Sequence, residues 1–227
     1  MGSVKNILIL NCGPGLDEVR NEFGIAVEWI QREVDGSKFK CTSMNVYDGE
    51  MPSYDDGDAW ILTGASESVY DDFDWIVELE QAIKLAIEVE KPILGICFGH
   101  QLIAQALGGV VEKNSKGWDL GSYPMNNILM HPLFENIETT DYFYNSHQDV
   151  VAKLPNGFIS LAENEMGNQA FHYGKRIFGV QFHPEFTHDI MNKYVEVRQD
   201  MGANVNDPSV PKSQTSRLII HNFLKLV

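Results

Sequence analysis

Residues 92–109 read Pro-Ile-Leu-Gly-Ile-Cys-Phe-Gly-His-Gln-Leu-Ile-Ala-Gln-Ala-Leu-Gly-Gly, and they form the most informative segment of the chain. The apolar run from Ile93 to Ile96 predicts a short buried strand, and a helical pattern of apolar residues begins directly after it. Cys97 stands at the junction, between Gly95 and Gly99. A reactive residue flanked by glycines at a strand-to-helix turn is typical of a nucleophile elbow. Glycine favours so sharp a turn because it has no Cβ atom to clash.

Cys97 has two interpretations. A free cysteine is most often a small buried hydrophobe. A thiol at a helix N-terminus instead lies near unpaired N–H groups and the positive end of the helix dipole, which favour the nucleophilic thiolate. A packed core cysteine needs no tight turn, so the flanking glycines favour the nucleophile.

A second motif lies near the C-terminus, where residues 177–186 read Ile-Phe-Gly-Val-Gln-Phe-His-Pro-Glu-Phe. This run predicts a strand that ends at Pro184, which cannot donate to a sheet. Residues two apart in extended backbone point to the same side, so His183 and Glu185 can face one site. An imidazole can take a proton from a thiol and return it to a leaving group, and a carboxylate can orient the imidazole. We expect Cys97, His183 and Glu185 to act together.

The two motifs together resemble the class I, or triad, glutamine amidotransferases. The chain is especially similar to the glutaminase domain of GMP synthetase and its stand-alone relatives. The resemblance covers nearly the whole chain in the expected order. It implies a cysteine nucleophile that cleaves a γ-glutamyl amide through a thioester.

The resemblance also implies an oxyanion hole. Residues 58–68 predict a strand that runs into a loop of small residues, Gly64-Ala65-Ser66, where the family often has Gly-Gly-Pro. In the family, a backbone N–H of this loop and the N–H after the nucleophile, here that of Phe98, hold the oxyanion. Gly64, Ala65 and Phe98 are therefore the expected oxyanion residues.

Substrate-binding residues follow from the same resemblance. Residues 142–151 resemble the family's Ser-His-x-Asp-x-Val stretch, whose backbone receives the α-amino and α-carboxylate groups of glutamine. This places Ser146, Gln148 and Asp149 at the substrate, together with Gln101, one helical turn after the nucleophile. We expect His147 to have a structural role in this loop.

The order of elements predicts the fold class. Strand-like and helix-like segments alternate up to residue 109, which indicates an α/β fold with an open, mainly parallel sheet and helices on both faces, as in flavodoxin-like proteins. Shorter strand-like runs follow and predict an extension of the sheet and a small antiparallel flap. A last amphipathic helix is expected over residues 216–226. The 227 residues show no linker or repeat, so we expect a single domain, residues 1–227. The expected elements before residue 109 are Asn6–Leu10, Val19–Val34, Lys40–Val46, Trp60–Leu62, Trp75–Val89 and the Cys97 strand and helix; those after it are Val110-Val111, Asn127–Met130, Tyr142–Tyr144, Ile159–Ala162, Ala170–Tyr173 and Ile177–Phe182.

Composition excludes several classes of function. A net charge of −15 argues against a nucleic-acid partner, which needs a basic patch. No apolar run is long enough to span a membrane, and no signal peptide is evident. Three cysteines suit a reducing cytoplasm. The histidines lack the spacing of metal ligands, and Gly13-Pro14-Gly15 is too short for a dinucleotide fingerprint, so neither a metal nor a cofactor is expected.

Three functions remain open. The chain can be a glutaminase that works with a separate acceptor or synthetase protein. It can be a γ-glutamyl peptidase that acts on γ-glutamyl peptides or conjugates. It can also be a non-catalytic module that binds glutamine, although an intact triad argues against this. In each case the ligand is a small molecule, glutamine or a γ-glutamyl compound.

Overall fold

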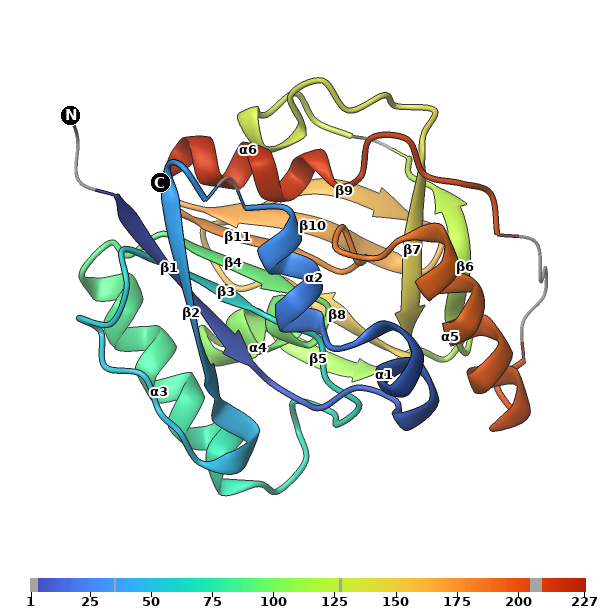
Figure 1. Cartoon of the computed structure of the whole chain (residues 1–227), viewed down its shortest axis with the longest axis horizontal. Helices are drawn as coiled ribbons and strands as arrows, with labels where there is room; N and C mark the ends of the chain where they lie inside the picture. Colours follow the sequence, from blue (N-terminus) through green and yellow to red (C-terminus); the bar gives the residue numbers. More distant parts are fainter. Residues whose placement is uncertain (1–3, 35, 127, 205–209) are drawn as a thin grey trace.

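A seven-stranded sheet forms the centre of the computed structural model, which describes residues 4–34, 36–126, 128–204 and 210–227. Its strands are β1 (Lys5–Asn11), β2 (Phe39–Asn45), β3 (Ala59–Leu62), β4 (Ile93–Ile96), β9 (Phe158–Asn164), β10 (Gly167–Tyr173) and β11 (Ile177–Val180). In space they follow the order β2-β1-β3-β4-β11-β10-β9 (Figure 1). The first five strands are parallel, and β10 and β9 continue the sheet antiparallel. This mainly parallel sheet confirms the expected α/β class.

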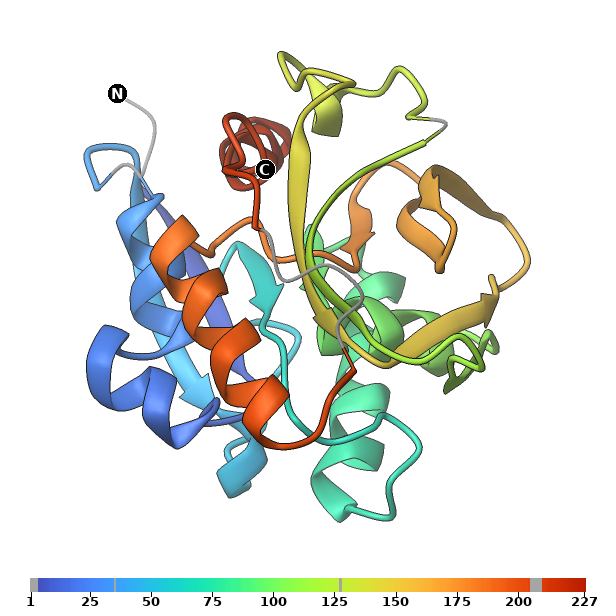
Figure 2. The ribbon, with the colours of Figure 1, turned by 90° about the vertical axis from the view of Figure 1, so that its right-hand side faces the viewer.

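Helices cover both faces of the sheet because successive strand side chains point in opposite directions. On one face, Ile7 and Ile9 of β1 belong to the apolar cluster that includes α2 (Ala26–Arg32) and α6 (Leu218–Leu226). On the other face, Leu8 and Leu10 pack in the cluster of α3 (Asp74–Glu88) and α4 (Phe98–Ala106). Figure 2 shows these two helical layers from the side.

Two small antiparallel sheets form the predicted flap. β5 (Val110–Lys113) pairs with β8 (Asp149–Lys153), and β6 (Asp119–Pro124) pairs with β7 (Tyr142–His147). A third apolar cluster joins β6 and β7 to α1 (Asp17–Phe23) and α5 (His188–Asp200). Two short 3-10 helices, Val46–Asp48 and Pro132–Phe134, complete the elements. The flap and α5 therefore stand beside the carboxyl ends of the parallel strands.

The structure corrects several expected elements. The stretch Val19–Val34 is not one helix, because Gly24 adopts a left-handed φ of 83° and separates α1 from α2. Of the expected strand Asn127–Met130, residue 127 lies outside the described residues, and residues 128–130 form no strand although Leu129 N–H donates to Leu161 O. The sequence patterns missed β6, β8 and α5 altogether. Among the described residues, none of the helices is both long and apolar enough to cross a bilayer.

Candidate active site

Cys97 forms the turn between β4 and α4. Its backbone has φ 53° and ψ −103°, a conformation that residues with a Cβ atom rarely adopt. The hydrogen bond from Cys97 N–H to Val180 O, 2.9 Å long, ties this turn to the end of β11. The Cys97 side chain is only 5% exposed. A residue held in such a conformation by its surroundings is typical of a functional site.

The two glycines beside Cys97 are sterically required. A Cβ atom on Gly95 would lie 2.4 Å from the backbone of Gly99. A Cβ atom on Gly99 would lie 2.6 Å from Leu62 Cβ and 2.9 Å from Leu62 O at the end of β3. The glycines therefore let the elbow pack directly against the neighbouring strand, as the sequence predicts.

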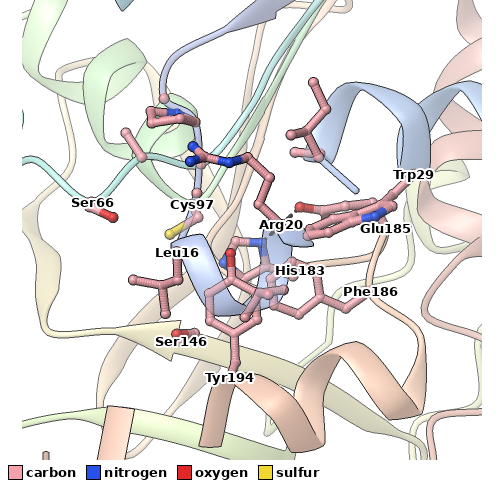
Figure 3. A pocket seen from close by; sticks show the side chains of 18 of the residues that line it. Leu16, Arg20, Trp29, Ser66, Cys97, Ser146, His183, Glu185, Phe186 and Tyr194 are labelled. Atoms are coloured by element: carbon pink, nitrogen blue, oxygen red, sulfur yellow. Dashed lines mark hydrogen bonds and ion pairs between the residues drawn. The ribbon is translucent and has the colours of Figure 1, made fainter. Parts of the chain in front are cut away.

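His183 lies next to Cys97 in the loop that follows β11. Its Nδ1 atom is 2.8 Å from Glu185 Oε1, and the Cys97 sulfur lies close enough to its ring to raise the imidazole pKa. The Phe186 ring stacks on the imidazole with centroids 4.0 Å apart. Figure 3 shows Cys97, His183 and Glu185 lining the same hollow. The structure thus brings the three expected residues together in the order Cys97, His183, Glu185.

The charge environment of His183 favours its protonated form. Burial alone would lower the pKa of the imidazole, but the charges of Glu185 and of the Cys97 sulfur outweigh burial and raise the pKa to about 10. Glu185 is 4% exposed, so its attraction to the ring is weakly screened by water. A protonated imidazole beside the sulfur can donate a proton to a leaving nitrogen.

The loop after β3 lies on the other side of the nucleophile. A Cβ atom on Gly64 would be 3.0 Å from His183 Cε1 and 3.5 Å from Cys97 Cβ, so the Gly64 backbone closely approaches both residues. Ala65 lines the hollow in front of Cys97. Phe98 opens α4, whose first N–H groups have no partner within the helix. The expected oxyanion residues therefore surround Cys97.

Two hollows open on either side of Cys97. Both are lined by Ala65, Ser66, Cys97, Ser146 and Arg198. The first extends past the catalytic candidates to α1 and α2 and is lined there by Leu16, Arg20 and Trp29, among others (Figure 3). The second contains the remaining residues expected to bind substrate, namely Gln101, Gln148 and Asp149.

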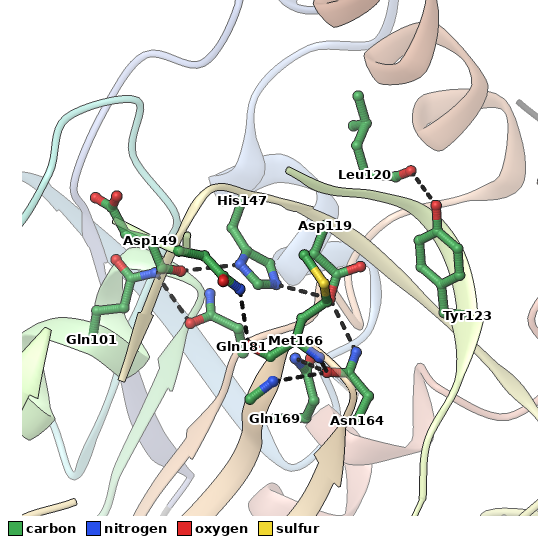
Figure 4. A network of polar contacts seen from close by, with 12 residues as sticks. Gln101, Asp119, Leu120, Tyr123, His147, Asp149, Asn164, Met166, Gln169 and Gln181 are labelled. Atoms are coloured by element: carbon green, nitrogen blue, oxygen red, sulfur yellow. Dashed lines mark hydrogen bonds and ion pairs between the residues drawn. The ribbon is translucent and has the colours of Figure 1, made fainter. Parts of the chain in front are cut away.

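A polar network fixes the wall of the second hollow (Figure 4). Gln101 Nε2 donates a hydrogen bond of 2.9 Å to Asp149 O. This glutamine therefore positions residues 146–149, here called the substrate segment, and also lines the hollow. His147 Nδ1 lies 3.0 Å from the same carbonyl oxygen, and its Nε2 lies 3.4 Å from Asp119 Oδ2. His147 is the last residue of β7 rather than part of a loop, and it also lines the second hollow.

The Asp149 carboxylate joins the substrate segment to the loop after β3. Its Oδ2 accepts a hydrogen bond of 2.5 Å from Ser68 Oγ, and its Oδ1 accepts one of 3.0 Å from Tyr70 O–H. Ser146 Oγ is buried and makes no hydrogen bond within the described structure. These contacts hold one wall of the hollow rigidly and leave a hydroxyl free inside it.

α5 contributes residues that the motifs do not contain. Tyr194 and Arg198 lie one helical turn apart and point toward the site, where both line the first hollow. The Tyr194 ring stacks on Phe186 with centroids 4.7 Å apart. One sequence signal could have revealed this helix: Thr187 caps it by accepting a hydrogen bond from Ile190 N–H.

The other two cysteines differ from Cys97. Cys12 is fully buried after β1, and burial raises the pKa of its thiol to about 12. Cys41 is partly exposed, and burial also raises its pKa. In the part of the chain that the structure describes, no group of three or more His, Cys, Asp or Glu residues could hold a metal ion.

The family model for glutamine amidotransferase class-I matches residues 21–198, which include the elbow and the His-Pro-Glu motif. The chain belongs to the class I glutamine amidotransferase family. It is 32% identical to gamma-glutamyl peptidase 3 of Arabidopsis thaliana over 161 residues, which cover 66% of this chain and 65% of that protein.

Two further similar proteins differ in how much of their own length this chain covers. A GMP synthase (glutamine-hydrolyzing) of Pyrobaculum aerophilum is 35% identical over 162 residues, which cover 71% of this chain but only 31% of the synthase. The crystal structure of a glutamine amidotransferase from Thermotoga maritima superposes with a TM-score of 0.73, covering 99% of this chain and 92% of that one, at 21% identity. The superposition supports the fold, and the sequence matches support the family.

Proposed function

We propose that this amidotransferase-family chain hydrolyses the γ-amide bond of a γ-glutamyl compound, with Cys97 as nucleophile. The observation that carries the proposal is the position of His183 between the Cys97 sulfur and the Glu185 carboxylate. The same residues could serve a core packing role, but a buried histidine paired with a carboxylate beside a strained cysteine is typical of an activated nucleophile.

In the proposed reaction the Cys97 thiolate attacks the γ-carbonyl carbon and forms a C–S bond. The N–H groups of Phe98 and Ala65 hold the resulting oxyanion. The tetrahedral intermediate collapses, the C–N bond breaks, and protonated His183 gives its proton to the leaving nitrogen. Water then attacks the thioester, losing a proton to His183, and glutamate leaves as the thiolate re-forms.

The identity of the leaving group separates glutaminase from γ-glutamyl peptidase. The first hollow favours the γ-glutamyl peptidase activity. It continues from His183 to Leu16, Arg20 and Trp29, and these residues offer contacts to a leaving amine that is larger than ammonia. A relative named gamma-glutamyl peptidase is consistent with this choice. A glutaminase that passes ammonia to a separate synthetase protein is the second candidate, supported by the GMP synthase relatives.

The test is a substrate panel measured with purified chain: glutamine, several γ-glutamyl dipeptides and a γ-glutamyl conjugate of glutathione type. We expect release of glutamate from the dipeptides with a higher kcat/KM than from glutamine, and none from a Cys97→Ala control. Faster hydrolysis of glutamine would favour the glutaminase. Binding of glutamine without turnover of any compound would instead identify a regulatory module.

Two properties of the whole chain belong to the same proposal. We infer that residues 1–227 act as one domain, since helices pack on both faces of one central sheet and an apolar cluster joins the flap to α1 and α5. We also infer a cytoplasmic location, which the three unpaired cysteines support. A co-purification from cells under mild conditions would test for an acceptor partner.

A further inference from the structure

We propose that Arg198 binds the α-carboxylate of the γ-glutamyl group. This inference rests on the proposed function, because it assigns a contact to the substrate of that reaction. Arg198 lies in the last turn of α5, outside both sequence motifs, and lines both hollows beside Cys97.

The Arg198 guanidinium is fixed in place without an acidic partner. It lies over the ring of Trp118, 4.8 Å from the ring centroid. Its Nε atom is buried and makes no hydrogen bond with any described residue, and no carboxylate oxygen of these residues lies within 4.0 Å of it. A half-buried cation without a counter-ion is costly, and a ligand anion would offset the cost.

The ionisable groups that act on the pKa of Arg198 form no ion pair with it. Burial lowers the pKa of Arg198, and the groups that act against this effect are the Tyr194 hydroxyl and the Cys97 sulfur. Tyr194 is itself held neutral, because burial raises its pKa. The Arg198 charge is therefore available to a carboxylate that enters the hollow beside the nucleophile.

The second hollow also contains negatively charged side chains. Asp149 and Glu67 both line it, and Glu67 Oε2 is buried without a hydrogen-bond partner. A γ-glutamyl group carries an ammonium and a carboxylate on one carbon atom. The arrangement suits that pair: the ammonium lies toward Asp149 and Glu67, and the carboxylate lies toward Arg198.

An anionic leaving group is the main rival for Arg198, because this residue also lines the first hollow. Arg20 lines the first hollow and not the second, although its guanidinium is paired with Asp17 at 2.8 Å. The γ-glutamyl assignment is favoured because Arg198 shares the second hollow with Gln101, Gln148 and Asp149. The two assignments predict different substrate dependence.

The experiment compares two substrates with the same leaving group, γ-glutamyl-p-nitroanilide and 4-aminobutyryl-p-nitroanilide, which lacks only the α-carboxylate. Arg198→Met should lower kcat/KM for the first by about 10- to 100-fold, mainly through KM, since a hydrogen bond to a charged group is lost. The same variant should leave the poor rate with the second substrate unchanged. Arg198→Lys should retain part of the preference, because it keeps the charge.

Arg176→Met is the matched control, because Arg176 is exposed and remote from both hollows. It should leave both rates at wild-type values. If Arg198→Met lowers both rates by the same factor, the role of Arg198 is structural and the proposal is wrong. The proposal is also wrong if the loss appears only with substrates whose leaving amine carries a carboxylate.

A binding measurement separates this proposal from the reaction itself. Calorimetry on Cys97→Ala should show glutamate binding at least 10-fold more tightly than 4-aminobutyrate, and the added substitution Arg198→Met should remove the difference. This readout requires no turnover. A wild-type chain that hydrolyses no γ-glutamyl compound would therefore overturn the proposed function, whereas equal binding of the two ligands would overturn the role of Arg198.

Discussion

The backbone conformation of Cys97 affects the stability of the protein independently of the sulfur atom. With φ at 53°, the residue pays a steric cost that glycine would not. We expect Cys97→Ala and Cys97→Gly both to abolish turnover, and Cys97→Gly to be more stable than Cys97→Ala by about 1 kcal/mol, since relief of strain exceeds the added chain entropy. Urea unfolding of the two variants measures this difference. A more stable alanine variant would show that the turn is unstrained.

The three thiols should also differ in reactivity. An electrophilic glutamine analogue at pH 7 should alkylate Cys97 and leave Cys12 unmodified, because Cys12 is fully buried and the pKa of its thiol is raised to about 12. Mass spectrometry of digested protein identifies the labelled residue. Excess free glutamate should slow the labelling of Cys97 and not that of Cys41. Label found mainly at Cys41 would contradict the site.

His183 links the charge of the site to stability. Its pKa is raised from 6.5 to about 10, so the native chain holds a proton that the unfolded chain releases between these values. This contribution to stability is complete below about pH 6.5 and is lost as the pH rises through about 10. In Glu185→Gln the largest attraction for the proton is gone, so this part of the pH dependence should be much weaker.

The catalytic rate gives a second test of the roles of His183 and Glu185, besides the pH dependence of stability. His183→Ala should lower kcat by several orders of magnitude, because the leaving nitrogen loses its proton donor. Glu185→Gln should lower it less, since an amide can still hold the ring. Unfolding free energies from pH 6 to 10 and kcat at pH 7 are measured on the same preparations. Wild-type rates in Glu185→Gln would place Glu185 outside the reaction.

At the scale of elements, the junction of β4 and α4 depends on close backbone packing. A methyl group on Gly95 would meet the Gly99 backbone at 2.4 Å, and neither backbone can yield without moving the elbow. We expect Gly95→Ala to destabilise the protein by about 3 kcal/mol and to abolish activity. Gly36→Ala is the control, because Gly36 is exposed with open space around it, and its unfolding midpoint should stay near that of wild type.

Elements with strong local patterns could be predicted from the sequence, and elements defined by tertiary contacts could not. The β4–α4 junction and β11 carry continuous apolar runs bounded by glycine or proline. By contrast, α5 contains the polar sequence His-Asp-Ile-Met-Asn-Lys-Tyr-Val-Glu-Val-Arg-Gln-Asp, and its apolar side is buried in a tertiary cluster with α1, α2 and the flap. The prediction of one helix over Val19–Val34 was wrong for the opposite reason. The helical pattern of the sequence continues across Gly24, but the positive φ of this residue ends the helix.

The same distinction holds for the site. Cys97, His183 and Glu185 could be placed from their motifs, because each lies at the end of a recognisable strand. Arg198 and Tyr194 could not, since no pattern shows that α5 lies over the hollows. The contact of Asp149 with Ser68 and Tyr70 joins residues about 80 positions apart, which only the tertiary fold brings together.

At the scale of the whole molecule, Asp141 fastens the C-terminal segment to the flap. Its carboxylate accepts hydrogen bonds from the backbone N–H groups of Gln214 and Thr215 and from Thr215 Oγ1. Burial alone would raise the pKa of Asp141, but these donors outweigh it and lower the pKa. The stabilisation is therefore present above pH 3.8 and is lost as the pH falls through the lowered pKa.

We expect Asp141→Asn to lower the free energy of unfolding by about 2 kcal/mol at pH 7, because buried donors lose a charged acceptor. The difference from wild type should shrink below pH 3, where the carboxylate is itself protonated. Asp72→Asn, at an exposed position, is the matched control and should change stability little. A loss that persists undiminished in acid would mean that packing, and not charge, fastens this segment.

The strand order β3-β4-β11 places three distant parts of the chain side by side in the middle of the sheet. Gly64, Cys97 and His183 meet only after β4 has paired with β3 and with β11. The paired residues Trp60 and Ile93 are 33 positions apart and Ile93 and Ile177 are 84 apart, and such long-range pairing is slow. Enzyme activity should therefore report the last step of folding. During refolding from urea, the circular dichroism signal of the helices should return first and hydrolysis should return last. A cell could thus make and hold a partly folded chain without exposing its metabolites to a working thiol.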